Sequence, residues 1–235
     1  MQLLGSLVFT TFLFVWTGGY AIVFALFGIF IPFRHRFRLA RNWGTVLLWV
    51  LKKTCRLDYR VEGQTQLPAG AHVALVKHSS SWETFAQTVL LPPQAWVLKR
   101  ELTWLPFLGW GVRLLHGIAV DRGAGHVAVK SVLQQGKARL EEGLWVVIFP
   151  EGTRMPPGQT RKYGISGALL AIENGALIVP VAHNAGYYWP RRGLMKKPGT
   201  IRVVIGAPIV AAGREPRELN QEVQDWIEAH SGPTP

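Results

Sequence analysis

The chain opens on a long apolar stretch. Its first 33 residues contain no Asp, Glu, Lys or Arg and are rich in Phe, Leu, Ile and Val. About 20 apolar residues in a helix suffice to cross a bilayer core, so the pattern predicts a retained membrane segment. Because Gly18 and Gly19 lie near its middle, either a single span or a helical hairpin dipping into one leaflet is compatible with it.

A second apolar segment, residues 42–54, is shorter and predicts a helix lying on the membrane interface. Four arginines precede it, at positions 34, 36, 38 and 41, and further basic residues lie at 52, 53 and 56. The first acidic residue of the chain is Asp58. Such a charge distribution favours the cytoplasmic face and attracts anionic headgroups, so we assign residues 1–57 to an N-terminal membrane anchor.

From Asp58 onward, short apolar runs alternate with amphipathic stretches. The strand-like runs lie near 72–76, 95–98, 117–120, 145–149, 177–182 and 201–205, and helical spacing is found within 129–140, 163–173 and 215–229. Strands that alternate with helices predict an α/β domain over residues 58–235. We expect a mostly parallel central sheet covered by helices on both faces.

Residues 102–114 fit neither pattern. They mix two Trp and a Phe with Gly and Pro and would make a poor regular helix. Three interpretations stay open: the segment belongs to the core, lies against lipid, or lines an apolar slot for a long ligand.

The formal net charge of +12 fits either a membrane surface or a nucleic acid as partner. No zinc-finger spacing and no aromatic RNA-binding pattern occurs, and the basic run adjoins the apolar segment, so the membrane is favoured over nucleic acid. Cys55 is the sole cysteine, which excludes an internal disulfide and is consistent with a cytosolic compartment.

Two of the strand-like runs end in clusters of ionisable residues. The run at 72–76 leads into Lys77-His78-Ser-Ser-Ser-Trp-Glu83, and the run at 145–149 leads into Phe149-Pro-Glu-Gly-Thr-Arg154. Open α/β sheets bind their ligands at the carboxyl ends of strands. We therefore expect the two clusters to form one composite site.

In the first cluster, His78 is a candidate general base and Glu83 its orienting carboxylate. A separation of five requires His78 to lie in a turn before a helix that starts near Ser80 or Ser81. Since Ser80 and Glu83 also fit a capping box, the alternative is that Glu83 only caps this helix. A serine nucleophile is disfavoured because no Gly-x-Ser-x-Gly elbow occurs. A zinc site is weak because no second histidine lies at ligand spacing.

Cations follow several of the strand-like runs. Arg154 closes the second cluster, where Gly152 permits a close backbone approach, while Arg122 follows the run at 117–120 and Lys162 follows a Pro-Pro-Gly loop. Brought to one side of a sheet, these cations would clamp a phosphate or carboxylate. Each one alone is also compatible with a surface charge.

Four sequence blocks then occur in a recognisable order. They are His78-x4-Glu83, Gly117-Ile-Ala-Val-Asp-Arg122, Phe149-Pro-Glu-Gly-Thr-Arg154 and Ile178-Val-Pro-Val181, with Lys162-Tyr-Gly164 after the third. Over roughly residues 58–210 the chain thereby resembles the glycerophospholipid acyltransferase superfamily, most closely its bacterial 1-acyl-glycerol-3-phosphate acyltransferases.

The resemblance implies direct acyl transfer with no metal, cofactor or covalent acyl-enzyme. His78, held by Glu83, would deprotonate the free hydroxyl of lysophosphatidic acid. That hydroxyl would attack the thioester of acyl-carrier protein or acyl-CoA, giving phosphatidic acid on the cytoplasmic face of a bacterial inner membrane. The acceptor phosphate would be held by Arg122, Arg154 and Lys162 with the backbone of Glu151, Gly152 and Thr153.

Two positions depart from the family pattern. Glu83 stands where the family usually has Asp, and Lys77 where it often has Asn. Lys77 is expected to add positive charge beside the base or a contact to the phosphate. These departures leave two alternatives open: another lyso-lipid acceptor, in lysophospholipid remodelling or as lyso-ornithine lipid, or an inactive lipid-binding membrane protein.

Overall fold

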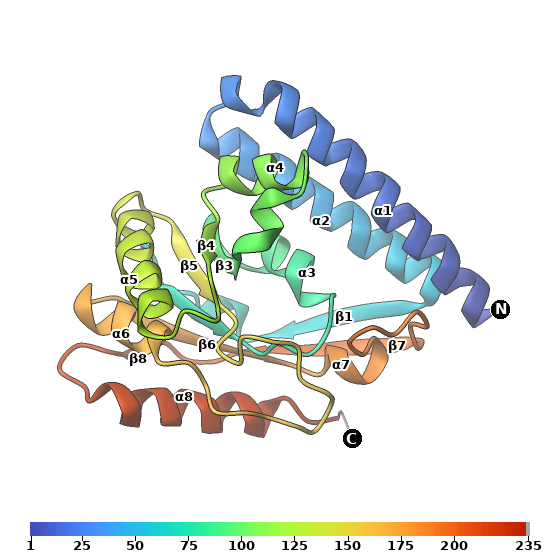
Figure 1. Cartoon of the computed structure of the whole chain (residues 1–235). Helices are drawn as coiled ribbons and strands as arrows, with labels where there is room; N and C mark the ends of the chain where they lie inside the picture. The colour runs from blue at the N-terminus through green and yellow to red at the C-terminus, as the bar shows by residue number, and fades with distance from the viewer. Residues whose placement is uncertain (234–235) are drawn as a thin grey trace.

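The computed structural model describes residues 1–233, and its centre is an eight-stranded sheet (Figure 1). The strands are β1 (Leu57–Glu62), β2 (Val73–Val76), β3 (Gln94–Lys99), β4 (Ile118–Val120), β5 (Trp145–Ile148), β6 (Leu177–His183), β7 (Gly199–Ile205) and β8 (Ile209–Val210). Their order is β1-β7-β6-β2-β5-β3-β4, with β8 paired to β6. The pairs β6–β7 and β6–β8 are antiparallel and all other pairs are parallel, so the expected mostly parallel α/β fold is confirmed.

Every apolar run from residue 72 onward forms a strand, whereas β1 and β8 were not predicted. β1 reads Leu-Asp-Tyr-Arg-Val-Glu and is an edge strand, so most of its side chains are only partly buried. An edge strand tolerates polar residues because one side of it faces solvent. Its sequence therefore lacks the continuous apolar run that marks the central strands.

Helices cover both faces of the sheet (Figure 1). One face carries α5 (His126–Glu141), α6 (Ser166–Glu173) and α8 (Pro216–His230). The other carries α2 (Phe33–Cys55) and α3 (Glu83–Leu90), with α1 (Gln2–Phe27) packed on the outside of α2. The short helices are α4 (Leu108–Leu114) and α7 (Ala185–Tyr188), and 3-10 turns lie at Gly28–Phe30, Gln64–Gln66 and Arg100–Trp104.

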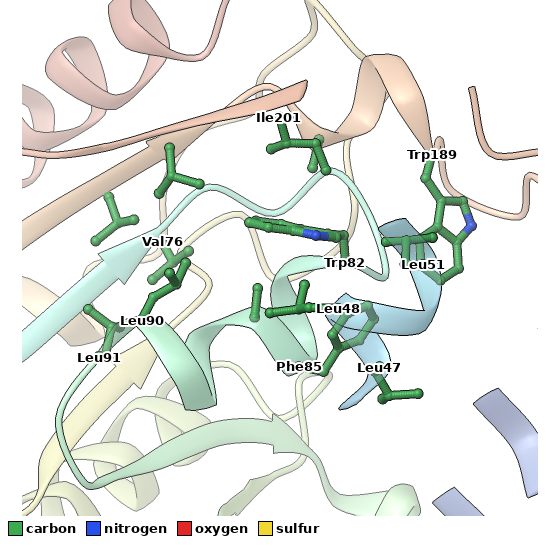
Figure 2. Close-up of a cluster of buried hydrophobic side chains, with 14 of the residues drawn as sticks. Leu47, Leu48, Leu51, Val76, Trp82, Phe85, Leu90, Leu91, Trp189 and Ile201 are labelled. Carbon is green, nitrogen blue, oxygen red and sulfur yellow. The ribbon is translucent and has the colours of Figure 1, made fainter. Parts of the chain in front are cut away.

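Trp82 is the central side chain of the core between the sheet and α2. Its side chain is almost fully buried, and Figure 2 shows it surrounded by Val76 and Ile201 from the sheet and by Leu48 and Leu51 from α2. Truncating a buried Trp to Ala typically destabilises a protein by about 3–5 kcal/mol. Because Trp82 directly precedes α3, its burial also fixes the loop that leads into this helix.

The N-terminal apolar segment forms one unbroken helix, as a single span requires, and the alternative hairpin bent at Gly18 and Gly19 is not formed. α1 runs unbroken through Gly18 and Gly19, and the chain reverses after Phe27, ahead of Pro32. A glycine weakens a helix by only about 1 kcal/mol, whereas proline lacks the N–H that a helix interior needs. The expected interfacial helix at 42–54 is the second part of the longer α2, whose first turns carry the arginines.

α1 is docked on the rest of the chain along its length. The segment Gln2–Phe30 is long and apolar enough to cross a membrane, and few of its residues are buried. On its inner face, Ser6 Oγ accepts the N–H of Lys196 at 3.0 Å, and Thr17 Oγ1 accepts Trp43 Nε1 at 3.2 Å. The assigned boundary after residue 57 falls at the start of β1.

Most of residues 102–114 lie outside the core, which argues against the first of the three interpretations; the exception is Leu114, which packs against the small buried cluster that contains Phe24. Trp104 is 63% exposed and Trp110 is 49% exposed. Both lie in the segment formed by the 3-10 turn Arg100–Trp104 and α4. This segment packs beside Phe24 of α1 and continues the apolar surface of α1. Leu108, Gly111 and Val112 also line an apolar cavity of ≈ 100 Å³ between α1, α2 and β3. The lipid-facing and slot interpretations are therefore both compatible with the structure.

Candidate active site

The two ionisable clusters lie side by side, as expected. β2 and β5 are neighbouring parallel strands with Leu75 opposite Ile148, so the segments that follow them leave the sheet at the same, carboxyl, end of the strands. The imidazole of His78 stacks on the ring of Phe149, with 4.4 Å between the ring centroids. The polar residues that follow each strand therefore share one region.

His78 and Glu83 form a buried pair. Nδ1 of His78 lies 2.9 Å from Oε1 of Glu83, and the same oxygen accepts the backbone N–H groups of Ser79 at 3.0 Å and Ser80 at 2.9 Å. Burial raises the pKa of Glu83, but the hydrogen bond with His78 and the nearby His183 outweigh it, and the pKa lies below its usual value. Glu83 is thus an ionised carboxylate, and Nε2 of His78 is left available to the cavity that this histidine lines.

His183 is a buried neighbour of this pair that the sequence analysis missed. Its Nε2 lies 3.8 Å from Oε2 of Glu83 and donates to the carbonyl of Lys77 at 2.8 Å, while its Nδ1 accepts the N–H of Ala185. Burial lowers the pKa of His183, so the ring is neutral near pH 7. The available signal was its position at the end of β6, two residues after the Ile178–Val181 block.

His78 opens onto a cavity of ≈ 400 Å³ that is rich in cations. The lining includes Lys99, Arg122, Thr153, Arg154 and Arg191, together with apolar side chains such as Trp96, Leu98 and Leu102. Arg122 donates to the carbonyl of Gly152, and Nε of Arg154 is buried without a hydrogen-bond partner among the described residues. An anionic group held here would lie in the same cavity as the histidine.

Arg191 was not among the expected site residues. It lies in the loop between α7 and β7, and its Nη1 donates to the carbonyl of Arg154 at 3.4 Å. The Trp-Pro-Arg-Arg-Gly sequence around it signals a loop, but the sequence does not indicate which end of the sheet the loop reaches.

Lys162 lies elsewhere than expected. It lines an adjoining cavity of ≈ 300 Å³ with Arg122, Arg161 and Gly152, and not the cavity that His78 lines. The loop after Arg154 returns along the sheet edge toward α6, so Lys162 is separated from His78 by the segment that carries Gly152. Arg122 borders both cavities.

Lys77 was expected beside the base or in contact with the phosphate, but it does not line the cavity of His78 and the phosphate cations. Side chains alternate between the two faces of a strand, so Lys77 and His78 leave the end of β2 in opposite directions. Nζ of Lys77 lies 2.7 Å from Oε1 of Glu151 and 2.7 Å from both carboxylate oxygens of Glu228. The side chain of Glu151 is likewise turned inward, and its Oε2 accepts the backbone N–H of His78.

The serines between His78 and Glu83 have structural contacts. Ser80 Oγ accepts the N–H of Trp82 at 3.1 Å, and Ser79 Oγ is buried without a hydrogen-bond partner in residues 1–233. Within that range no serine hydroxyl bonds to His78, and no group of three or more His, Cys, Asp or Glu side chains is arranged to hold a metal ion.

Sequence comparisons relate the chain to known proteins. A family model described as Acyltransferase matches residues 58–184, which is more than half of the chain. The chain is 44% identical over 201 residues to the 1-acyl-sn-glycerol-3-phosphate acyltransferase of Pseudomonas aeruginosa, covering 84% of this chain and 78% of that protein. It is 28% identical over 179 residues to the enzyme of the same name from Salmonella typhimurium, covering 69% and 67%.

A structural comparison agrees at the level of the fold. The crystal structure of the 1-acyl-sn-glycerophosphate (LPA) acyltransferase PlsC from Thermotoga maritima superimposes with a TM-score of 0.78. The match covers 97% of this chain and 93% of that chain at 22% sequence identity. The resemblance drawn from the four sequence blocks is thereby confirmed, and the chain belongs to the acyltransferase family.

Proposed function

We propose that this acyltransferase moves a fatty acyl group from an acyl-thioester to the free hydroxyl of 1-acyl-glycerol-3-phosphate, giving phosphatidic acid. One observation carries the proposal: His78, with Nδ1 held by Glu83, lines the same cavity as Arg122, Arg154 and Arg191. A base for a hydroxyl and cations for a phosphate are the two groups that this acceptor requires. The names of the Pseudomonas and Salmonella relatives support the same acceptor.

In the proposed reaction, Nε2 of His78 takes the proton of the acceptor hydroxyl as its oxygen attacks the thioester carbonyl. The C–S bond then breaks, and the imidazolium returns the proton to the leaving thiolate. Glu83 keeps the ring oriented through Nδ1 and stabilises the cation that forms. Because a thioester is already activated, placing base and hydroxyl correctly supplies much of the rate, and no acyl-enzyme is required.

The acceptor phosphate would contact Arg154, Arg191 and Arg122 in the His78 cavity, with Thr153 at its wall. Lys162 would add positive charge from the adjoining cavity, which Glu151 and Gly152 also line. The N–H of Gly152 already donates to the carbonyl of Phe149 at 2.9 Å, so it would not contribute. Each of these cations would interact with the phosphate more strongly than a fully solvated ion pair does, because the cavity limits the access of water.

The membrane-facing parts of the chain suit lipid substrates. The apolar cavity of ≈ 100 Å³ between α1, α2, α4 and β3 would take part of an acyl chain, and the exposed apolar face of α1 would contact the bilayer. The arginines at the start of α2 would bind anionic headgroups. We place the protein on the cytoplasmic face of a bacterial inner membrane, with acyl-carrier protein or acyl-CoA as donor.

A donor and acceptor panel tests the proposal. The full chain in lipid vesicles would be given acyl-carrier protein or CoA thioesters with lysophosphatidic acid, another lysophospholipid or lyso-ornithine lipid. We expect lysophosphatidic acid to be used best and His78→Ala to abolish turnover. Preference for a phosphate-free acceptor would overturn the substrate, and absence of turnover with every pair would favour a lipid-binding protein.

A further inference from the structure

A buried network of three ionisable side chains links the C-terminal helix to the backbone of His78. Nζ of Lys77 lies 2.7 Å from Glu151 on one side and 2.7 Å from both carboxylate oxygens of Glu228 on the other. Oε2 of Glu151 accepts the N–H of His78 at 2.5 Å. The contacts therefore run without a gap from α8, through Lys77 and Glu151, to the residue that we propose as the base.

The network is largely shielded from water. Lys77 is 4% exposed and Glu151 is 2% exposed, while the side chain of Glu228 is 25% exposed. Glu228 is itself fixed, because its Oε1 accepts the hydroxyl of Tyr163 at 2.7 Å and that of Thr160 at 2.9 Å. A buried ammonium that loses a carboxylate partner cannot easily be compensated by solvent, so each member constrains the other two.

Two of the three residues, Lys77 and Glu228, have no role in the chemistry proposed above. Lys77 and Glu228 line a separate cavity of ≈ 210 Å³ behind the end of β2, and neither lines the cavity of the phosphate cations. Glu228 also lies beyond residues 58–184, the part of the chain that the family model matches. The α8 side of the network is thus separate from both the substrate cavity and the shared sequence blocks.

We infer that Lys77 and Glu228 are positioning residues for acyl transfer: through Glu151 they hold the backbone N–H of His78 and thereby set where its imidazole stands against the acceptor hydroxyl. This inference rests on the proposed role of His78 as base. It gives a physical reason for a lysine at position 77, because an uncharged side chain there would leave Glu151 and Glu228 without their shared cation. Displacing a reacting group by about 1 Å can lower a rate by about 100-fold, so a small shift of His78 suffices.

The test uses the full chain in vesicles and the variants Lys77→Met, Glu228→Ala and the double variant. We expect kcat to fall about 10- to 100-fold in each single variant, with the acceptor KM changed less than about twofold, because the phosphate cations are untouched. The double variant should lose no more than the worse single variant, since both act through one chain of contacts. Asp225→Asn, an exposed charge on the same helix, is the matched control and should keep wild-type kcat.

Hydrogen exchange of the segment 77–83 gives a readout that does not depend on turnover. We expect the His78 amide to exchange at least about tenfold faster in Lys77→Met and Glu228→Ala than in wild type or Asp225→Asn. Glu228→Gln keeps an oxygen that can accept from Lys77, Tyr163 and Thr160, so exchange of the His78 amide should increase less in this variant than in Glu228→Ala. Unchanged exchange, unchanged kcat or additive losses would each overturn the inference. If exchange is faster in the two variants but the wild-type protein transfers no acyl group, the proposed function is refuted while the positioning of the His78 backbone stands.

Discussion

Oε1 of Glu83 lies 2.9 Å from Nδ1 of His78 and at the same time accepts the backbone N–H groups of Ser79 and Ser80. One carboxylate oxygen thus orients the histidine and fixes the loop that leads into α3. The helix cap that the sequence offered as the alternative is not formed, because α3 begins at Glu83 with Trp82 at its N-cap and no side-chain cap hydrogen bond within residues 1–233. The second oxygen, Oε2, is buried without a hydrogen-bond partner among the described residues and faces His183. The extra methylene of Glu relative to Asp is accommodated by the loop that carries these donors.

Neutralising this carboxylate should remove most of the activity. Glu83→Gln keeps the size of the side chain but removes the charge that stabilises an imidazolium, so we expect kcat to fall about 100-fold or more with little change in the acceptor KM. Glu83→Asp retains the charge but withdraws it from Nδ1, and a fall of about tenfold is expected. Steady-state kinetics on both variants check this. A wild-type kcat in Glu83→Gln would exclude Glu83 as the partner of the base.

The strands and most helices could be predicted because burial leaves a direct mark on the sequence. β2 and β5 are covered on both faces and read as continuous apolar runs, whereas β1 lies at the edge and alternates with polar residues. The turn that follows the N-terminal helix could not be placed, since Gly18 and Gly19 tolerate a helix that neighbouring packing stabilises. Local propensity decides such a position only when tertiary contacts are weak.

Site residues were predictable where they directly follow a strand, and less so where a long loop intervenes. His78 and Arg154 lie within a few residues of β2 and β5, so the sheet edge fixes their place. Lys162 lies at the end of a loop of irregular structure and lines a different cavity from the expected one. Arg191 comes from a loop whose path depends on contacts with α1, which no local pattern reveals.

Arg191 should contribute to acceptor binding. It lines the His78 cavity and donates to the carbonyl of Arg154, so Arg191→Ala removes one cation from the proposed phosphate site. A charge-assisted hydrogen bond contributes about 1.5–3 kcal/mol, which corresponds to an acceptor KM raised about tenfold or more. The neighbouring Arg192, which does not line this cavity, supplies the control Arg192→Ala. Equal effects of the two substitutions would show that only the overall positive charge matters.

Lys196 should stabilise the docking of α1 on this loop. It is 1% exposed, and its Nζ donates to two α1 groups, the carbonyl of Ser6 at 3.4 Å and Oγ1 of Thr10, and to the carbonyl of Leu194 in its own loop at 2.8 Å. Lys196→Met keeps the packing but removes the donated hydrogen bonds, and we expect the free energy of unfolding to fall by about 1–3 kcal/mol. Denaturation of the detergent-solubilised protein measures this.

The adjacent Lys197 makes a matched comparison because its side chain is exposed. Lys197→Met should leave the free energy of unfolding within about 0.5 kcal/mol of wild type. If the two variants have the same free energy of unfolding, the buried contacts of Lys196 with α1 do not stabilise the fold.

Glu151 should make the stability of the fold depend on pH near neutrality. Burial raises the pKa of Glu151 to about 7, and Lys77 only partly opposes this effect. The folded state therefore binds the proton more tightly than the unfolded chain, in which the pKa of a glutamate is about 4.3. The resulting stabilisation is fully present below that unfolded value and is lost as the pH rises through about 7.

Glu151→Gln removes this titration while keeping a side chain of the same size. The difference in free energy of unfolding between Glu151→Gln and wild type should therefore shift in favour of the variant as the pH rises from 5 to 8, with a slope of at most about 1.4 kcal/mol per pH unit. Denaturation at several pH values measures the difference, in which the contributions of the other titrating groups cancel. A difference that stays constant over this range would mean that Glu151 is already ionised at pH 5. Its burial would then be fully compensated by Lys77 and by the N–H of His78.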